Sequence, residues 1–446
     1  MKLKRNLLAL TLALLGAAPL LWAQSEKLSL EDALDRARAH NRSVAAAAFE
    51  VKRAKESKEA AATQRLPSFA VSADFGQLLT RPYLDLKEGV LGTNNGVPLP
   101  DQSLRLSMTR TPSVFGFAQA VQPLSRQYQI GLEIKALDIN RQIGEERLSA
   151  SKQQIAYQVR SAYAQLIDET HSLEAVEADI ALYTELERVT EAYMAERTIL
   201  RSELLQVQAR LLHAKYDQTV ALNSFKATKE QLNVLMGRDP ETAFDVDLST
   251  DLDIVLPTPG EAIAKALRQR SDLKEAQLQI ERADLDRRAK KAEYIPDVSL
   301  AATYLNLSGS GLPIGGGGYA EIGVQLKWEP FDWGRKHHEM AEKAAVVSEA
   351  RLTAHEMDSK VRVEVATALR DLQAAQQLLG SVVLDEQAAN ESLRVIQAKY
   401  AERAALLDEV LKAQSTCAQA RQQVDHARAA VRTDYAALLK AMGEDL

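Results

Sequence analysis

Two long stretches without proline dominate this sequence. One covers residues 124–239 and the other covers 331–446, so each is 116 residues long. Proline removes a backbone hydrogen bond and clashes with the preceding helical turn, so stretches of this length without it favour long helices. We therefore predict two long helical blocks, separated by proline-bearing segments of another kind.

The segments that precede the two blocks resemble each other, which indicates an internal repeat. Each carries Arg-Ser, an Ala-rich charged run, a proline (Pro67 or Pro296), and then alternating apolar and polar residues. Each also begins with a helix-capping pattern, at Ser29 and at Thr258. We expect two structural copies of one unit.

The predicted elements follow the same order in both copies. The first repeat (24–240) is expected to hold a helix at 28–65, strands at about 67–77 and 104–122, and a helical hairpin at 125–236. After a linker at 241–258, the second repeat (259–446) is expected to hold a helix at 259–293, strands at about 296–307 and 319–329, and a hairpin at 333–442.

The second arm of each hairpin has core residues spaced alternately by three and four. One seam runs from Leu204 to Leu235, and the other from Val410 to Ala441, with each position 206 residues after its counterpart. A period of 3.5 residues predicts helices packed along partner helices. Cys417 falls on the second seam and is expected to be a small buried residue. Asp434 also falls there, facing another hairpin or lining water.

The alternating segments have the pattern of membrane-spanning strands. Ile322, Val324, Leu326 and Trp328 alternate with polar residues, and about ten residues span a bilayer when a strand is tilted. Open sheet edges are not tolerated in lipid, and four strands are too few to close a barrel. Two chains would supply about eight strands and three about twelve. Two small hairpins on a soluble coiled coil are the alternative.

The N-terminus has the pattern of a cleaved secretory signal. The basic "MKLKRN" precedes the apolar "LLALTLALLGAAPLLWA", so residues 1–23 are predicted to be removed after Ala23. No later stretch has the ~18–20 apolar residues of a membrane helix. The single cysteine, Cys417, excludes an intrachain disulfide, and none lies near the cleavage point to carry a lipid anchor.

The sequence gives little evidence of catalysis, metal binding or nucleic-acid binding. The net charge of −6 argues against a nucleic-acid partner. No nucleophile elbow, P-loop, zinc signature or dinucleotide fingerprint occurs, so neither an enzyme nor a cofactor is expected. His337 and His338 would point about 100° apart on a helix, without a histidine four residues away, so no metal site is expected there.

The stretch "WEPFDWGRKHH" (328–338) predicts a junction between a strand and a helix. Aromatic residues favour the membrane interface, proline ends strand hydrogen bonding, and Asp332 is placed to cap the helix that follows. The junction residues are Trp328, Pro330, Trp333 and Gly334, with Pro123 of "VQPL" as the counterpart in the first repeat.

The paired order of these elements resembles the TolC-like outer-membrane efflux proteins, the outer membrane factors. The resemblance rests on "LSLEDALDRARAHN", the two strand starts that follow a proline, "VQPL" with "WEPFDWGR", and the turns "YMAER" and "YAER". The resemblance covers nearly all of the mature chain. It implies an α+β membrane protein and a homotrimer, whose 12-stranded β-barrel, with four strands per chain, continues into an α-barrel of long coiled-coil helices.

The resemblance also implies a function. It implies the outer-membrane channel component of a tripartite efflux or type I secretion system of a Gram-negative bacterium, with a large periplasmic part. Such a channel is a passive export duct, gated at its periplasmic helical tips, that docks a periplasmic adaptor and an inner-membrane pump. A non-conducting periplasmic coiled-coil protein, structural or adaptor, is the alternative. An adaptor would usually have one hairpin and lipoyl-like β segments, whereas two hairpins are predicted here.

Specific residues follow from the resemblance. The periplasmic constriction falls at Glu409, with Glu203 as its counterpart, and Lys412 stands where family members often have a second acid. Glu409 and Lys412 are one turn apart and could pair within the helix, or belong to a plain solvated face. The adaptor-docking tips fall at Tyr193, Glu196, Arg197, Tyr400, Glu402 and Arg403. The family's tip glycine is absent, and "NRS" and "QRS" replace its "NP".

Overall fold

The computed structural model describes residues 27–77, 79–80, 83–107, 113–196, 199–248, 254, 256–306, 318–402 and 404–444. The predicted signal at 1–23, and the tip residues Arg197 and Arg403, lie outside these ranges. The chain divides into two compact units. Unit 1 comprises Met1–Ala47, Leu148–Ser271 and Asp358–Leu446, and unit 2 comprises Ala48–Arg147 and Asp272–Met357.

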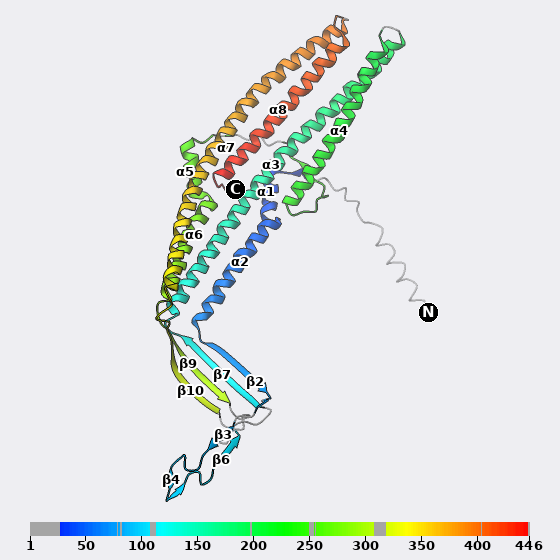
Figure 1. The fold of residues 1–446 in the computed structure, drawn as a ribbon. Helices are drawn as coiled ribbons and strands as arrows, with labels where there is room; N and C mark the ends of the chain where they lie inside the picture. Colours follow the sequence, from blue (N-terminus) through cyan, green and yellow to red (C-terminus); the bar gives the residue numbers. More distant parts are fainter. Residues whose placement is uncertain are drawn as a thin grey trace, which may run out of the picture. The chain divides into compact units, whose positions relative to one another are not determined.

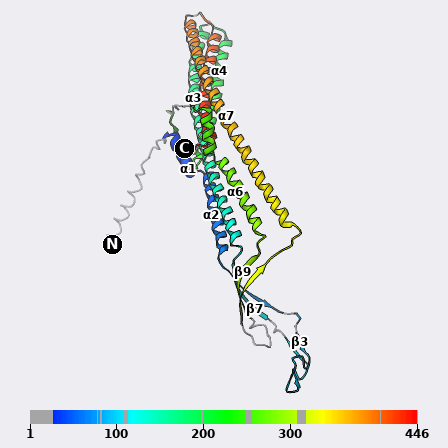
Figure 2. The same cartoon turned by 90° about the vertical axis from the view of Figure 1, so that its left-hand side faces the viewer.

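Unit 1 is built mainly from two helical hairpins. It contains α1 (Leu30–His40), α4 (Arg201–Leu235), α5 (Pro259–Gln269), α8 (Leu407–Ala441), and the later parts of α3 (Gln127–Ala195) and α7 (Arg335–Ala401). Helix α3 turns back into α4, and α7 turns back into α8 (Figures 1 and 2). Two short strands, β1 (Lys27–Leu28) and β8 (Asp245–Val246), pair in parallel beside them.

The predicted heptad seams are the packed faces of these hairpins. In α8 every seam position except Asp434 is buried, and Cys417 is fully covered. In α4 both ends of the seam are buried, whereas its middle, from Gln218 to Phe225, is only half-buried. The 3.5-residue spacing is confirmed for α8, and the half-buried middle of α4 coincides with a cavity described below.

The largest core of unit 1 joins the short strands to α1, α3 and α4. Leu28, Leu34, Leu166, Leu232 and Phe244 are buried in this cluster. The Tyr163 hydroxyl lies among them, 3.0 Å from the carbonyl oxygen of Leu28 and 2.9 Å from that of Asp247. One phenol therefore ties both short strands to α3 while its ring fills the core.

The helix expected over 28–65 is wrong in one respect, because it is divided at Asn41. The backbone of Asn41 is extended (φ −64°, ψ 129°), and its Oδ1 accepts from the amides of Ser43 (2.8 Å) and Val44 (3.2 Å). Its Nδ2 donates to the carbonyl of Leu235 at 2.8 Å. Asparagine therefore starts α2 (Arg42–Ala62) as a separate helix and ties it to the end of α4.

Two further expectations need correction. The helix expected over 259–293 is divided at the extended residue Arg270 into α5 and α6 (Ser271–Ala292). The strand expected over 104–122 is two strands, β6 (Leu104–Ser107) and β7 (Ser113–Pro123). Strand β6 pairs with β3 (Tyr83–Leu86) in a separate small sheet. A further short hairpin, β4 (Thr93–Asn94) with β5 (Val97–Pro98), lies in the segment expected to be loop. Both predicted N-caps, Ser29 and Thr258, are confirmed.

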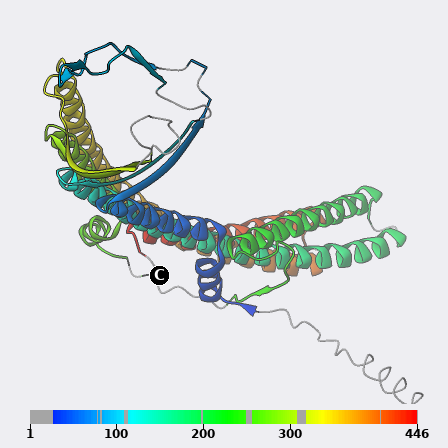
Figure 3. The same cartoon turned by 90° about the horizontal axis from the view of Figure 1, so that it is seen from below.

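Unit 2 carries a four-stranded antiparallel sheet at the ends of its helices. The strands are β2 (Ser68–Gly76), β7, β9 (Asp297–Asn306) and β10 (Gly318–Lys327), in the order β10-β9-β7-β2. Viewed along the strands, the sheet is bent into an arc (Figure 3). Its two outer strands, β10 and β2, pair on one side only among the described residues.

The register of the sheet places the large apolar residues of β2 and β10 on one face. Val324 of β10 pairs with Leu300 of β9, and Val71 of β2 pairs with Ala118 of β7 on that same face. The opposite face carries polar residues such as Ser72, Thr303, Glu321 and Gln325, but also Phe117 and Val121 of β7 and Leu305 of β9. The two outer strands are thus amphipathic, whereas β7 is mixed.

Candidate functional site

The apolar face of the sheet is uncovered in this single chain. Its large side chains are between 64% and 84% exposed at Phe69, Val71, Phe75, Ile322, Val324 and Leu326. A contiguous exposed apolar surface of this kind marks contact with lipid or with another protein. Within the described parts of the chain, no helix is long and apolar enough to cross a membrane.

The junction after β10 has the capped geometry expected for it. Asp332 Oδ1 accepts from the Gly334 amide (3.1 Å), and its Oδ2 accepts from the Lys336 amide (3.0 Å). These backbone hydrogen bonds, that from Lys336 first, lower the pKa of Asp332. Helix α7 begins at Arg335, directly after the cap.

Exposed aromatic rings surround this junction. Trp328 follows the last residue of β10 and Trp333 is 88% exposed. Trp333 packs edge-on against Phe331, with ring centroids 4.8 Å apart, and has a left-handed backbone (φ 57°) that is strained for a bulky residue. In the first copy Pro123 is the last residue of β7. Pro330 lies between the strand and the cap.

The predicted constriction residues lie at the start of the returning helices. Glu409 caps its own helix, because its Oε2 accepts from the Leu406 amide at 3.4 Å. Lys412 pairs with Asp408 at 2.6 Å rather than with Glu409, and this bond raises the pKa of Lys412. The suggested Glu409–Lys412 pair is therefore wrong. Both residues still line one groove between α7 and α8.

The ends of the two hairpins lie close enough to interact electrostatically. Burial, and then the neighbouring Tyr193 and Glu203, raise the pKa of Tyr400. Tyr400 also packs against the apolar cluster of Leu407, Leu411 and Val207. The structure thus brings together residues from both predicted tips, whereas Glu196 and Glu402 are exposed.

Two exposed leucines at the hairpin ends were not anticipated. Leu200 and Leu406 are the N-cap residues of α4 and α8, and they are 69% and 70% exposed. They occupy matching places in the two hairpins. The signal in the sequence was an apolar residue after each turn, before the helix start, where a polar cap is usual.

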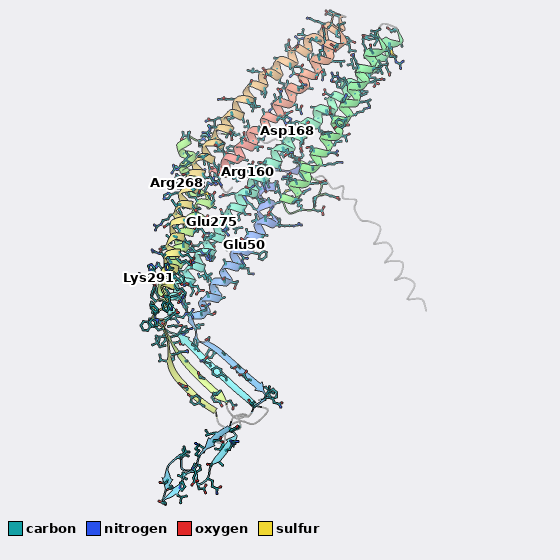
Figure 4. All side chains as sticks on the ribbon, viewed as in Figure 1. Glu50, Arg160, Asp168, Arg268, Glu275 and Lys291 are labelled. Carbon is teal, nitrogen blue, oxygen red and sulfur yellow. The ribbon has the colours of Figure 1, made fainter. Side chains whose placement is uncertain are left out.

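A polar cavity of about 650 Å³ lies among α3, α4 and α8 in unit 1. Carboxylates from all three helices line it, at Asp168, Glu169, Asp179, Asp217 and Asp425. Burial is the main cause of the raised pKa of Asp168 and of Asp179. Asp168 is labelled on α3 in Figure 4.

Hydrogen bonds across this cavity connect the first hairpin to the second. Gln414 of α8 donates to Asp179 of α3 (3.0 Å), and His426 Nδ1 lies 2.8 Å from Asp168 Oδ2. Within the first hairpin, the hydroxyls of Ser224 and Thr228 donate to Glu169 Oε1 at 2.6 and 3.0 Å. These links sit at the half-buried middle of the α4 seam, where small and polar residues leave space.

The structure also describes Asp434 and the two neighbouring histidines His337 and His338. Asp434 is half-buried, and burial and then the charge of Asp371 on α7 raise its pKa. His337 and His338 stack edge-to-face, with ring centroids 5.5 Å apart. Over the described residues, no group of three or more His, Cys, Asp or Glu side chains is arranged to hold a metal ion.

Part of the chain matches a known protein family in sequence. The sequence model of the outer membrane efflux protein family matches residues 262–444. The outer membrane efflux protein BepC of Brucella suis is 23% identical over 231 residues, which are 52% of this chain and 50% of that protein. The match thus spans about half the length of this curated relative.

The fold of almost the whole chain matches solved structures of outer-membrane channels. The CusC structure superposes with a TM-score of 0.76 at 17% identity, covering 93% of this chain and 92% of CusC. The Campylobacter jejuni CmeC outer membrane channel gives a TM-score of 0.75 at 15% identity, covering 93% and 85%. The chain is thus similar to outer-membrane efflux proteins, in sequence over residues 262–444 and in fold over almost its whole length.

This chain combines two kinds of surface already described. One is the sheet with its exposed apolar face and its aromatic junction in unit 2. The other is the pair of hairpins in unit 1, joined across a polar cavity.

Proposed function

We propose that the protein is the outer-membrane channel component of a tripartite efflux or type I secretion system. The observation that supports this most directly is the four-stranded sheet with one exposed apolar face and two open edges. Lipid satisfies the apolar face, but it offers no hydrogen-bond partner to the free backbone groups of β2 and β10. The sheet therefore requires further strands when it enters the membrane.

A homotrimer supplies those strands. Joining β2 of one protomer to β10 of the next would continue the same ladder and remove every open edge. Three copies of the four strands give a closed barrel of about twelve strands, within the size range of membrane barrels. Trp328 and Trp333 then mark the level of the membrane interface, where amphipathic rings are favoured.

Membrane fractionation and planar-bilayer recording test this function. The expected result is an outer-membrane protein that migrates as a heat-modifiable trimer and forms conducting pores. A periplasmic protein that gives no conductance would refute the channel and favour the alternative, a coiled-coil structural or adaptor protein.

Gating is proposed at the hairpin ends, with Glu203 and Glu409 lining the constriction and Lys412 beside them. Tyr193, Glu203 and Tyr400 already interact electrostatically in the single chain, which supports a closed end built from both hairpins. Replacing Glu203 and Glu409 together by Ala is expected to raise conductance. Unchanged conductance in the double variant, with Glu391→Ala as a surface control, would contradict this gate.

Docking of a periplasmic adaptor is proposed at the same ends. The exposed Leu200 and Leu406 form apolar projections, and apolar projections of this kind are suited to seat in a partner's groove. Glu196, Arg197, Glu402 and Arg403 are proposed as the charged rim around them. An inner-membrane pump would supply the energy through the adaptor.

Cysteine crosslinking tests the docking. In a Cys417→Ala background, Leu200→Cys and Leu406→Cys are expected to crosslink to the adaptor. Val324→Cys on the sheet serves as the control and is expected to give no crosslink. Crosslinks from the sheet position alone would contradict docking at the hairpin ends.

A further inference from the structure

We propose that a pocket around Arg160 binds a small organic carboxylate with an apolar body. Arg160 lies on α3 in unit 1 (Figure 4), and only 9% of its surface is exposed. Its Nη2 atom has no hydrogen-bond partner among the described residues. A buried guanidinium nitrogen without a partner is costly, so its presence beside a cavity indicates an anion that is bound there.

The pocket beside Arg160 has a volume of about 260 Å³ and lies among α1, α3 and α8. Its wall is largely apolar, formed by Leu30 and Leu34 of α1, Ala164 and Ile167 of α3, and Leu439 of α8. Apolar walls with a few convergent polar groups are typical of small-molecule sites. The pocket lies wholly within unit 1.

The charges around the pocket favour an anion. Burial, and then the positive charge of Arg38, lower the pKa of Arg160, and Arg432 lines the same pocket as a second guanidinium. The wall also holds two acids, but the Glu444 carboxylate is bonded to Lys265 Nζ at 2.5 Å. The other, Glu31, is on the exposed side of α1. The charge of Glu444 acts on Arg160 in the direction opposite to that of Arg38. With Glu444 paired to Lys265, the two arginines of the wall still favour an anion.

A carboxylate on an apolar body satisfies both parts of the pocket. The planar guanidinium binds a carboxylate through paired, charge-assisted hydrogen bonds. The leucine and isoleucine side chains would cover the rest of the ligand, because burying apolar surface is favourable. An inorganic sulfate or phosphate would leave those side chains without a partner. None of the residues that line this site belongs to the proposed constriction, the docking tips or the sheet.

Fluorine NMR on the purified full-length protein in detergent tests the site. The probe is 4-fluorobenzoate, with 4-fluorobenzamide as its uncharged analogue of nearly the same shape and protein-free micelles as the blank. We expect the benzoate signal to broaden in the presence of protein and to sharpen again when unlabelled benzoate is added. The benzamide signal is expected to be the same with protein as in the blank.

Matched variants locate the binding. Arg160→Met removes the cation while keeping a similar apolar volume, and it is expected to weaken benzoate binding at least tenfold. Leu30→Trp fills the pocket from its partly buried rim and is expected to abolish binding with Arg160 still present. The control is Arg268→Met, which removes an exposed arginine of α5 that donates to the Ala264 carbonyl of its own helix.

Four results of the NMR experiment would overturn the proposal. They are an unbroadened benzoate signal with the wild-type protein, equal binding of benzamide, undiminished binding by Arg160→Met, and undiminished binding by Leu30→Trp. A structure of the assembled protein with another copy's carboxylate on Arg160 would also replace the small ligand with a contact between copies. If Arg160→Met does not fold, Leu30→Trp alone decides the outcome.

Discussion

His426 Nδ1 of α8 lies 2.8 Å from Asp168 Oδ2 of α3, and a second pair crosses it in the reverse sense. There, His171 Nδ1 of α3 lies 3.4 Å from Asp425 Oδ1 of α8. Each helix thus contributes one histidine and one aspartate to the contact. Two hairpins from distant parts of the chain are joined by reciprocal polar links instead of by apolar packing alone.

Removing the links between α3 and α8 is expected to favour the open channel. The double variant Asp168→Ala/Asp179→Ala loses the bonds to His426 and Gln414. Each such bond contributes ~1 kcal/mol, so the ratio of open to closed channels is expected to rise about tenfold or more. Single-channel recording measures this ratio. Glu391→Ala is the control, because Glu391 is an exposed residue that pairs with Arg394 of its own helix. An equal rise in both proteins would contradict the prediction.

Stability is expected to fall as the buried carboxyls of the cavity ionise. Burial raises the folded-state pKa of Asp168 and Asp179 above the unfolded value. The folded state therefore holds these protons more tightly. This contribution to the free energy of unfolding is complete below the pKa that the groups have in the unfolded state. It is lost as the pH rises through their pKa in the folded state.

The matched variant for this pH effect is Asp179→Asn. It keeps the shape of the side chain but does not titrate, so its stability is expected to change less across that acid range than that of the wild-type protein. Urea unfolding at a series of pH values from about 3.5 upward provides the measurement. If the free energy of unfolding changes with pH in the same way for the two proteins, the buried-carboxyl explanation is contradicted.

Asn41→Ala is expected to lower the free energy of unfolding by about 2 kcal/mol. The substitution removes the cap of α2 and leaves the Leu235 carbonyl without its side-chain donor, and each loss costs ~1 kcal/mol. Thermal unfolding followed by circular dichroism would detect the change. Ser43→Ala, two residues along the chain at an exposed position, is expected to stay within ~0.5 kcal/mol. Similar losses in both variants would rule out the capping explanation.

Gly237→Ala is expected to destabilise the protein strongly, whereas Gly260→Ala is not. Gly237 has a left-handed backbone (φ 73°), and a Cβ there would lie 2.3 Å from the carbonyl oxygen of His40. A Cβ on Gly260 would meet nothing within 4 Å, so alanine is tolerated in the first turn of α5 and gains up to ~1 kcal/mol of helix propensity. Urea unfolding measures the free energy of unfolding of the two variants. Equal values would contradict the close approach of residue 237 to the His40 carbonyl.

Local patterns in the sequence predicted the long helices, the α8 seam, both N-caps and the alternation of the strands. These depend on proline placement and on side-chain period, which short-range physics fixes. The breaks at Asn41 and Arg270 were missed, because the Ala-rich and charged runs around them are compatible with uninterrupted helix. The division of 104–122 was missed because strand pairing is a long-range choice.

The candidate site, too, was predicted in part from the sequence and was in part visible only in the structure. The roles of Glu203, Glu409 and the tip tyrosines were predicted from the family resemblance and stay predictions, and only the structure shows Glu409 capping its own helix and Lys412 paired with Asp408. Arg160 stands as a lone charge among the apolar residues of α3, a signal that the sequence contained.

The sequence by itself determined the kinds of element in this protein and the faces on which apolar residues lie, because these follow from local backbone preference and periodicity. Only the tertiary structure decided which side chains from distant segments meet. Asp168 with His426, Asn41 with Leu235, and the pocket at Arg160 each depend on packing between helices that are far apart in the chain. Such contacts are set by the fit of whole helix surfaces, which no short stretch of sequence contains.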